Sequence, residues 1–430
     1  MRTIQAHSHL DAISSTPELR TLAEALDSGE QAAVLGSAGS STSLLAGAVA
    51  QRTGALVLLC VAHLDEADEV IDELGAVGLD ATRLPALEVL PGETGVSLDL
   101  FAERIGVARR ALAQELRGVL VCPIQSLMQA VPAPDRMSDL LMTLEPGDSR
   151  GPEEIVRWLA AAGYQRLDSV EEPGDFAVRG GIIDVFPPSG ERGGGGAVRL
   201  DFFGDELETL TEIDLETMGS DRRLKSVELI GASLESVLND DKTVPFLDLV
   251  TTDAVALLAE TLEVTEQGRG YYERVTDARG VIGPPAVLKT LRERFRGFAE
   301  INQFARVDAA VALDAPVRPL PEFARDASEA VAELGELTRE RRVLVLCQNE
   351  AEQQRLGELI DEFGGGAPIE TTVAYLHRGF QWDDASGGGT ALVPYHELLH
   401  RYQTRRRIRR LRGGRSADTF LEVAVGDYVV

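Results

Sequence analysis

The chain has 430 residues and a formal net charge of −28, with 44% hydrophobic and 26% charged residues. This length predicts about two to four domains, and the acidic balance argues against nonspecific coating of DNA by the whole surface. The N-terminus lacks the apolar segment of a signal peptide, and the longest apolar run, near residues 55–64, is far shorter than the ~20 residues of a membrane span. These features predict a cytoplasmic protein.

Residues 30–130 alternate short β-branched runs with amphipathic segments, which predicts a parallel sheet with helices on both faces. The predicted strands cover residues 32–35, 56–61, 87–90 and 118–122, and the predicted helices cover 43–51, 64–74, 98–112 and 124–130. The three cysteines lie in apolar runs without paired spacing, so we expect buried, reduced thiols at Cys60, Cys122 and Cys347.

Residues 36–43, Gly-Ser-Ala-Gly-Ser-Ser-Thr-Ser, lie between the first strand and its helix, as a phosphate-binding loop does. A functional loop ends in Gly-Lys-Ser/Thr, because the ammonium group holds the phosphate oxygens and the hydroxyl binds Mg²⁺. Here Ser41 and Thr42 replace the glycine and the lysine. We therefore predict a degenerate nucleotide-binding remnant without catalytic residues, although the string also fits an ordinary turn. The remnant comprises Gly36, Gly39, Ser41, Thr42 and Ser43.

The pattern changes near residues 145–148. A predicted helix at 153–162 is followed by short strands, two of which meet at a Gly204–Asp205 hairpin turn. These strands are predicted at 176–179, 182–186, 198–203 and 207–210. This pattern is typical of a small α+β module inserted into the α/β part.

The remaining pattern returns to mixed elements, with its longest predicted helix at 286–305 and a proline-rich linker at 316–321. A third unit follows, with strands at 342–347, 370–375 and 390–393 and a helix at 350–363. The predicted fold class is thus multidomain α/β: a RecA-like, P-loop-type parallel sheet domain (1–141 and 225–315), an inserted α+β module (142–224), a small α/β domain (322–400) and an arginine-rich connector (401–419).

Three strings resemble the module shared by the excision-repair protein UvrB and the transcription-repair coupling factor (Mfd) family. They are Leu-Pro-Ala-Leu-Glu-Val-Leu-Pro at 84–91 followed by Phe-Ala-Glu-Arg-Ile at 101–105, Gly-Asp-Phe-Ala-Val-Arg-Gly-Gly-Ile-Ile-Asp-Val-Phe-Pro at 174–187, and its continuation at 198–208. UvrB keeps an intact loop and a motor, so the degenerate loop favours the coupling factors. Leu-His-Arg-Gly-Phe at 376–380 does so too, and residues 420–430 resemble the start of an RNA-polymerase-interacting domain.

This resemblance implies a recruitment and regulatory region that binds UvrA and links stalled RNA polymerase to nucleotide excision repair. It places the UvrA contact on the inserted module, with Arg166, Arg179 and Phe186 as candidates, because arginine and aromatic residues often anchor interfaces. Alternatively, Arg179 orders the hairpin and Phe186 fills the module core. The resemblance also implies RNA polymerase and double-stranded DNA as partners, and ATP with Mg²⁺, through downstream motor domains. We expect the chain to end before that motor and to have no cofactor or activity of its own.

Two enzymatic alternatives remain. The first is a zinc metallopeptidase using His396-Glu397-x-x-His400, with Glu422 as a possible third ligand. Pro394 and the arginines after His400 argue against the long helix that such a site needs, so we expect no metal. The second is a UvrB-type excision-repair ATPase. The arginine run at 401–415 fits a connecting helix, a linker or a nucleic-acid contact.

Overall fold

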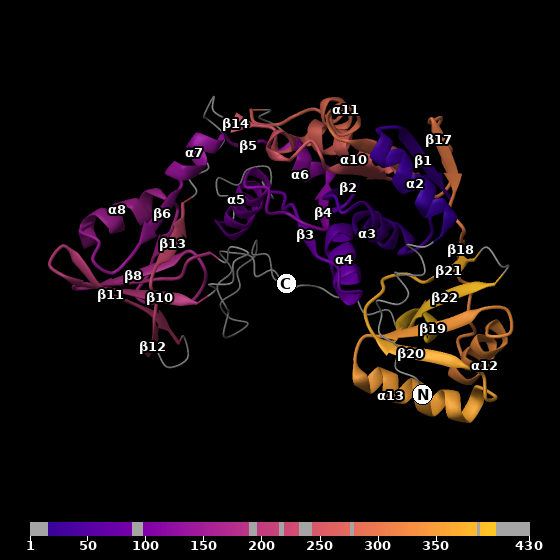
Figure 1. The fold of residues 1–430 in the computed structure, drawn as a ribbon. Coiled ribbons are helices and arrows are strands. Elements are labelled where there is room, and N and C mark those ends of the chain that lie inside the picture. Colours follow the sequence, from indigo (N-terminus) through magenta and orange to yellow (C-terminus); the bar gives the residue numbers. More distant parts are fainter. Residues whose placement is uncertain are drawn as a thin grey trace, which may run out of the picture.

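The computed structural model describes residues 16–87, 98–188, 196–214, 219–231, 243–275, 279–384 and 388–400. Figure 1 shows a central α/β part, a module in magenta on one side, and a unit in orange and yellow on the other. The predicted multidomain α/β fold is confirmed, with a large parallel sheet and several smaller sheets. No helix within these ranges is both long and apolar enough to span a bilayer.

A seven-stranded sheet forms the central part, and all its neighbouring strands are parallel, as predicted. Four of its strands are wholly buried, which is typical of strands covered on both faces: Val-Leu-Leu-Cys-Val, Val-Leu-Val-Cys-Pro, Val-Ala-Leu-Leu-Ala and Gly-Phe-Ala-Glu-Ile-Asn. In sheet order the strands are β17 (Val311–Asp314), β1 (Gln31–Leu35), β16 (Gly297–Asn302), β15 (Val255–Ala259), β2 (Val57–Val61), β4 (Val119–Pro123) and β3 (Ala81–Arg83).

Helices pack on both faces of this sheet, and the alternation of side chains along β2 divides the two cores. Leu59 belongs to the core that also contains residues of α2 (Pro17–Ser28), α3 (Ser41–Thr53) and α4 (Leu64–Ala76). Leu58 and Cys60 belong to the other core, with residues of α5 (Leu98–Leu112), α6 (Ile124–Met128), α10 (Thr261–Arg274) and α11 (Pro284–Arg294).

One of the predicted elements is wrong, and another lies mostly outside the described residues. The helix predicted at 286–305 covers α11 but also β16, which lies between β1 and β15. Apolar residues such as Phe298 follow a helical spacing there, but Gly297 lies so close to α2 that an added β-carbon would be 2.4 Å from the carbonyl oxygen of Leu26. Of the strand predicted at 87–90, Leu87 lies outside the described strands and 88–90 lie outside the described ranges; the sheet also contains β3, which the sequence did not predict.

The inserted module is a six-stranded sheet, antiparallel except for its β7–β8 pair. Its order is β12 (Ser220–Arg223), β11 (Glu206–Ile213), β10 (Ala197–Phe203), β9 (Ile182–Val185), β8 (Asp175–Arg179) and β7 (Gln165–Arg166). The predicted Gly204–Asp205 turn joins β10 to β11. Helix α8 (Pro152–Ala161) covers one face through Ile155 and Leu159.

The chain enters and leaves the module side by side, because β6 (Leu141–Leu144) pairs antiparallel with β13 (Val227–Ile230). Nearby, β5 (Val131–Pro132) pairs with β14 (Thr243–Val244). Helix α7 (Pro134–Asp139) and the 3-10 helix η1 (Phe246–Leu249) complete this region. The module therefore connects to the central part through adjacent segments that are far apart in sequence (Figure 1).

The third unit is a five-stranded mixed sheet. Its order is β18 (Val317–Pro319), β21 (Phe380–Asp383), β22 (Gly389–Pro394), β19 (Arg342–Cys347) and β20 (Ile369–Val373), and its helices are α12 (Ala327–Leu337), α13 (Glu350–Phe363) and α14 (Tyr395–Leu398). The bounds of β19 and α13 are those predicted from the sequence. The cysteines of β2, β4 and β19 are all buried and free, as expected.

Candidate functional site

The degenerate loop has the predicted strand–loop–helix context. It follows β1, and α3 begins at Ser41, earlier than predicted. Gly36 and Gly39 have φ angles of 91° and 55°, which favour glycine. The Oγ of Ser41 accepts a hydrogen bond from the Ala38 amide at 2.9 Å. Thr42, which occupies the lysine position, thus lies in the first turn of α3.

A cavity of about 740 Å³ opens beside this loop. Six carboxylates are among its lining residues: Asp65, Glu66, Glu69, Glu73, Glu260 and Glu263. Among the described lining residues, Arg378 is the single arginine or lysine. Burial, followed by repulsion from Glu73, raises the pKa of Glu69 to about 7. This crowding of acidic groups makes the cavity unfavourable for a triphosphate, in addition to the missing lysine.

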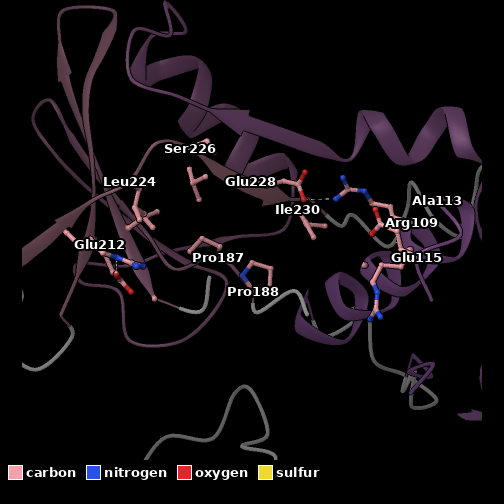
Figure 2. A pocket seen from close by; sticks show the side chains of 16 residues that line it. Arg109, Ala113, Glu115, Pro187, Pro188, Glu212, Leu224, Ser226, Glu228 and Ile230 are labelled. Carbon is pink, nitrogen blue, oxygen red and sulfur yellow. Dashed lines mark hydrogen bonds and ion pairs between the residues drawn. The ribbon is translucent and has the colours of Figure 1, made fainter. Parts of the chain in front are cut away.

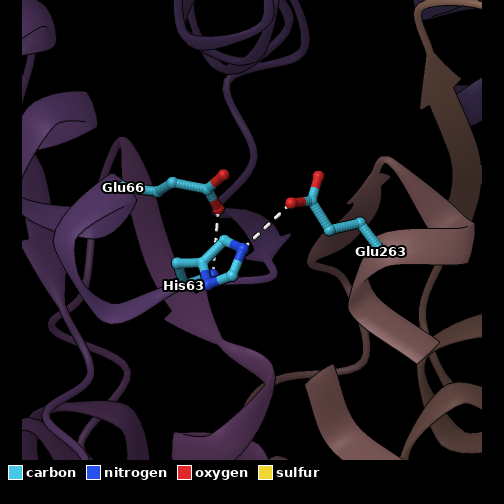
Figure 3. Close-up of side chains that lie close together, drawn as sticks. All are labelled: His63, Glu66 and Glu263. Carbon is cyan, nitrogen blue, oxygen red and sulfur yellow. Dashed lines mark hydrogen bonds and ion pairs between the residues drawn. The ribbon is translucent and has the colours of Figure 1, made fainter. Parts of the chain in front are cut away.

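Figure 3 shows a histidine and two glutamates at this cavity, with one ligand atom from each within 4.8 Å of the others. The Nε2 of His63 lies 2.9 Å from Oε1 of Glu263, and Oε2 of Glu66 accepts the amides of Ala62 and His63 at 3.0 Å. The His63–Glu263 hydrogen bond becomes an ion pair when the imidazole is protonated, and the Glu66 contacts cap the first turn of α4. Sequence reasoning missed the cluster because Glu263 is 200 residues from His63.

The His396-Glu397-x-x-His400 motif does not form a zinc-binding helix, so the metallopeptidase alternative is not supported. Helix α14 has four residues and ends before His400, whose φ is 51°. The two imidazoles contact different carbonyl oxygens, those of His377 and Phe323, each at 2.9 Å. Glu397 accepts the amide of Gly379 at 2.7 Å. Glu422, the possible third ligand, lies outside the described residues.

One of the two exposed candidate arginines, Arg179, lies on the module face opposite α8. Arg179 lies two residues after buried Ala177 on β8, so both point to this face. The side chain of Arg179 is 52% exposed. Beside it, the carboxylate of Asp184 is 1% exposed and is held by Arg199 at 2.7 and 2.9 Å. Arg179 approaches the same carboxylate at 3.8 Å and donates to the Asp168 carbonyl oxygen at 2.6 Å.

The other two candidates lie elsewhere on the module. Arg166 is exposed on the edge strand β7, where the register places it beside Phe176, a residue of the core under α8. Phe186 is 8% exposed and packs with Ala177 and Ile213. This is the packing role that the sequence left open for Phe186. The structure therefore does not bring the three candidates together on one surface.

Sequence reasoning missed an exposed aromatic at the tip of the β10–β11 hairpin. Phe203 is 80% exposed, whereas the preceding Phe202 packs toward the core under α8. Because Phe202 packs on the α8 side of β10, the next side chain, that of Phe203, points to the opposite face, which also carries Arg179. Two adjacent phenylalanines before a turn were the available signal, since one of them must point away from a one-sided core.

A second cavity, of about 550 Å³, lies between α5 and the module (Figure 2). The Arg109–Glu228 ion pair, at 2.5 Å, joins α5 to β13 beside it. Pro187, Pro188 and Leu224 also line this cavity. It lies at the connection between module and central part, away from Arg179. The arginine run at 401–415 and the string at 420–430 lie outside the described residues.

Comparison with known proteins identifies related sequences. Residues 142–234 match the model of the UvrB interaction domain. The chain is 26% identical over 250 residues to the transcription-repair-coupling factor of Bacillus subtilis, covering 57% of this chain and 21% of that protein. It is 30% identical over 178 residues to the Haemophilus influenzae factor (41% and 15%) and 33% over 194 residues to the Mycobacterium bovis factor (43% and 15%). The matched part thus spans about a fifth or less of these relatives.

Proposed function

Because the chain is related to the N-terminal region of transcription-repair coupling factors, we propose that it recruits UvrA through its inserted module and thereby links transcription to excision repair. The observation that carries the proposal is the match of residues 142–234 to the UvrB interaction domain. RNA polymerase and double-stranded DNA are further partners that we propose for the complete protein. None of the described residues is assigned to them.

The contact surface that we propose is the module face opposite α8, centred on Arg179 and Phe203. An exposed arginine and an exposed aromatic on one face are a common composition for interface anchors. Arg179 keeps half of its side chain in solvent, and its guanidinium can pair with a partner carboxylate. Phe203 has nothing to bury its ring within the described chain. Arg166 lies on the edge strand β7 in register with Phe176, on the α8 side, so any contact it makes with UvrA would be separate from this surface.

The experiment measures binding of purified UvrA to the chain by calorimetry. Arg179→Ala and Phe203→Ala should each weaken binding about 30-fold, since truncating a central anchor costs about 2 kcal/mol. The matched control is Arg157→Ala, because Arg157 is an exposed arginine on α8, at the opposite face. We expect this control to bind like the unmodified chain, and the same holds for Glu153→Ala.

Two outcomes would contradict the proposal. If the folded chain shows no affinity for UvrA at tens of micromolar, the recruitment function itself is wrong. If Arg157→Ala weakens binding as much as Arg179→Ala, the attraction is general electrostatics rather than a contact at this face. Melting curves of each variant separate loss of contact from loss of fold, because exposed side chains should change stability little.

A further inference from the structure

A segment of the third unit lies directly against the degenerate loop. The backbone amide of Ser40 donates to the carbonyl oxygen of Arg378 at 3.1 Å, and the amide of Arg378 donates to Ser40 Oγ at 2.9 Å. The next amide, of His377, donates to Oε1 of Glu73 at 2.9 Å. Glu73 in turn accepts a hydrogen bond from the Ser40 hydroxyl. Loop, α4 and third unit thus share one hydrogen-bond network.

The approach of the two backbones depends on Gly39. A β-carbon on Gly39 would lie 2.6 Å from the carbonyl oxygen of Gly379 and 2.9 Å from that of Arg378. Both distances are shorter than van der Waals contact allows. The segment is also held from its own side, because the amide of Gly379 donates to Glu397. The loop and the segment therefore fit each other without room for a further side chain.

Apolar packing around these polar contacts is continuous between the two units. Leu44 and Leu45 of α3 belong to the same buried cluster as Leu346, Leu376 and Phe380 of the third unit. A shared core of this kind is typical of a stable contact rather than a passing one. The third unit is thus seated on the loop and the helix that follows it.

In a nucleotide-binding loop, backbone amides donate to phosphate oxygens. Here a peptide carbonyl oxygen accepts the Ser40 amide, and Glu73 accepts the serine hydroxyl. We propose that residues 36–43 form an intramolecular peptide-binding site whose occupant is His377–Gly379, and that this occupation excludes phosphates independently of the missing lysine. This site is distinct from the UvrA surface, and its test does not depend on UvrA.

The first experiment is hydrogen exchange of the full chain with Gly39→Ala. Gly54→Ala is the matched control, since Gly54 has a similar φ of 64°, flanks the other end of α3, and has nothing within 4 Å of an added β-carbon. Both variants place alanine at a similar positive φ, but only the added β-carbon of Gly39→Ala meets the segment. We expect amides of residues 376–380 to exchange at least tenfold faster in Gly39→Ala than in Gly54→Ala. Equal exchange rates in the two variants would overturn the proposed contact between His377–Gly379 and the loop.

A second pair of variants avoids backbone strain. Ser40→Ala removes the acceptor of the Arg378 amide, whereas Ser43→Ala removes only a hydroxyl that bonds Glu73. We expect the amides of residues 376–380 to exchange faster in Ser40→Ala than in Ser43→Ala. Equal exchange rates in these two variants would contradict the proposed contact. For the exclusion of phosphate, Ser41→Gly/Thr42→Lys restores the loop residues. Fluorescent ATP should still fail to bind this variant at 1 mM, and binding would overturn the exclusion.

Discussion

The two arginines around Asp184 should respond very differently to truncation, although both face the same carboxylate. Arg199 holds both oxygens of this buried carboxylate, with 19% of its own side chain exposed. Arg179 reaches it only at 3.8 Å and is 52% exposed. Arg199→Ala should therefore remove the main partner of a buried charge, whereas Arg179→Ala should leave that partner in place.

The expected magnitudes follow from this geometry. Removing one partner of a buried ion pair costs about 3 kcal/mol, because the remaining charge stays uncompensated. An exposed arginine at a longer distance contributes less than about 1 kcal/mol. The two variants should therefore differ by about 2 kcal/mol or more in the stability of the module. The central sheet should be unaffected, since β9 and β10 carry the pair.

Hydrogen exchange under native conditions measures this difference locally. The slowest amides of β9 and β10 exchange through opening of the module, and 3 kcal/mol corresponds to an increase in rate of about a hundredfold. We expect that increase in Arg199→Ala and less than about fivefold in Arg179→Ala, with amides of β2 and β4 unchanged in both. The reasoning is refuted if the two variants exchange equally fast, because Asp184 would then not depend on Arg199.

Two further predictions concern Glu73 and the histidine motif. Burial raises the pKa of Glu73 from 4.5 to about 7, so the folded chain binds this proton more tightly than the unfolded chain. The free energy of unfolding should therefore fall as the pH rises from about 4.5 to about 7. Urea titrations at these pH values should show a smaller fall for Glu73→Gln. An identical pH dependence of the two proteins would mean that the carboxyl is ionised throughout. Elemental analysis of protein purified without chelator should find no stoichiometric zinc, and one equivalent that disappears in His396→Ala would restore the peptidase alternative.

Much of the fold follows from the sequence, because local patterns decide it. Buried β-branched runs alternating with amphipathic segments specify the parallel strands and the helices beside them, and Gly204–Asp205 specifies its hairpin. The missing lysine at Thr42 is likewise visible in the chain alone. These features depend on neighbours within a few residues, so no tertiary information is needed to recognise them.

The tertiary structure decided what depends on contacts between distant residues. The apolar residues keep a helical spacing past α11, but the chain from Gly297, which packs closely against Leu26 of α2, is a strand. The loop at Ser40 meets Arg378, 338 residues away, and no local pattern records that a peptide carbonyl, rather than a phosphate, accepts its amide. The HExxH string looked like a zinc site because spacing alone cannot show that its helix ends early. Local periodicity specifies elements, whereas packing between elements specifies the site.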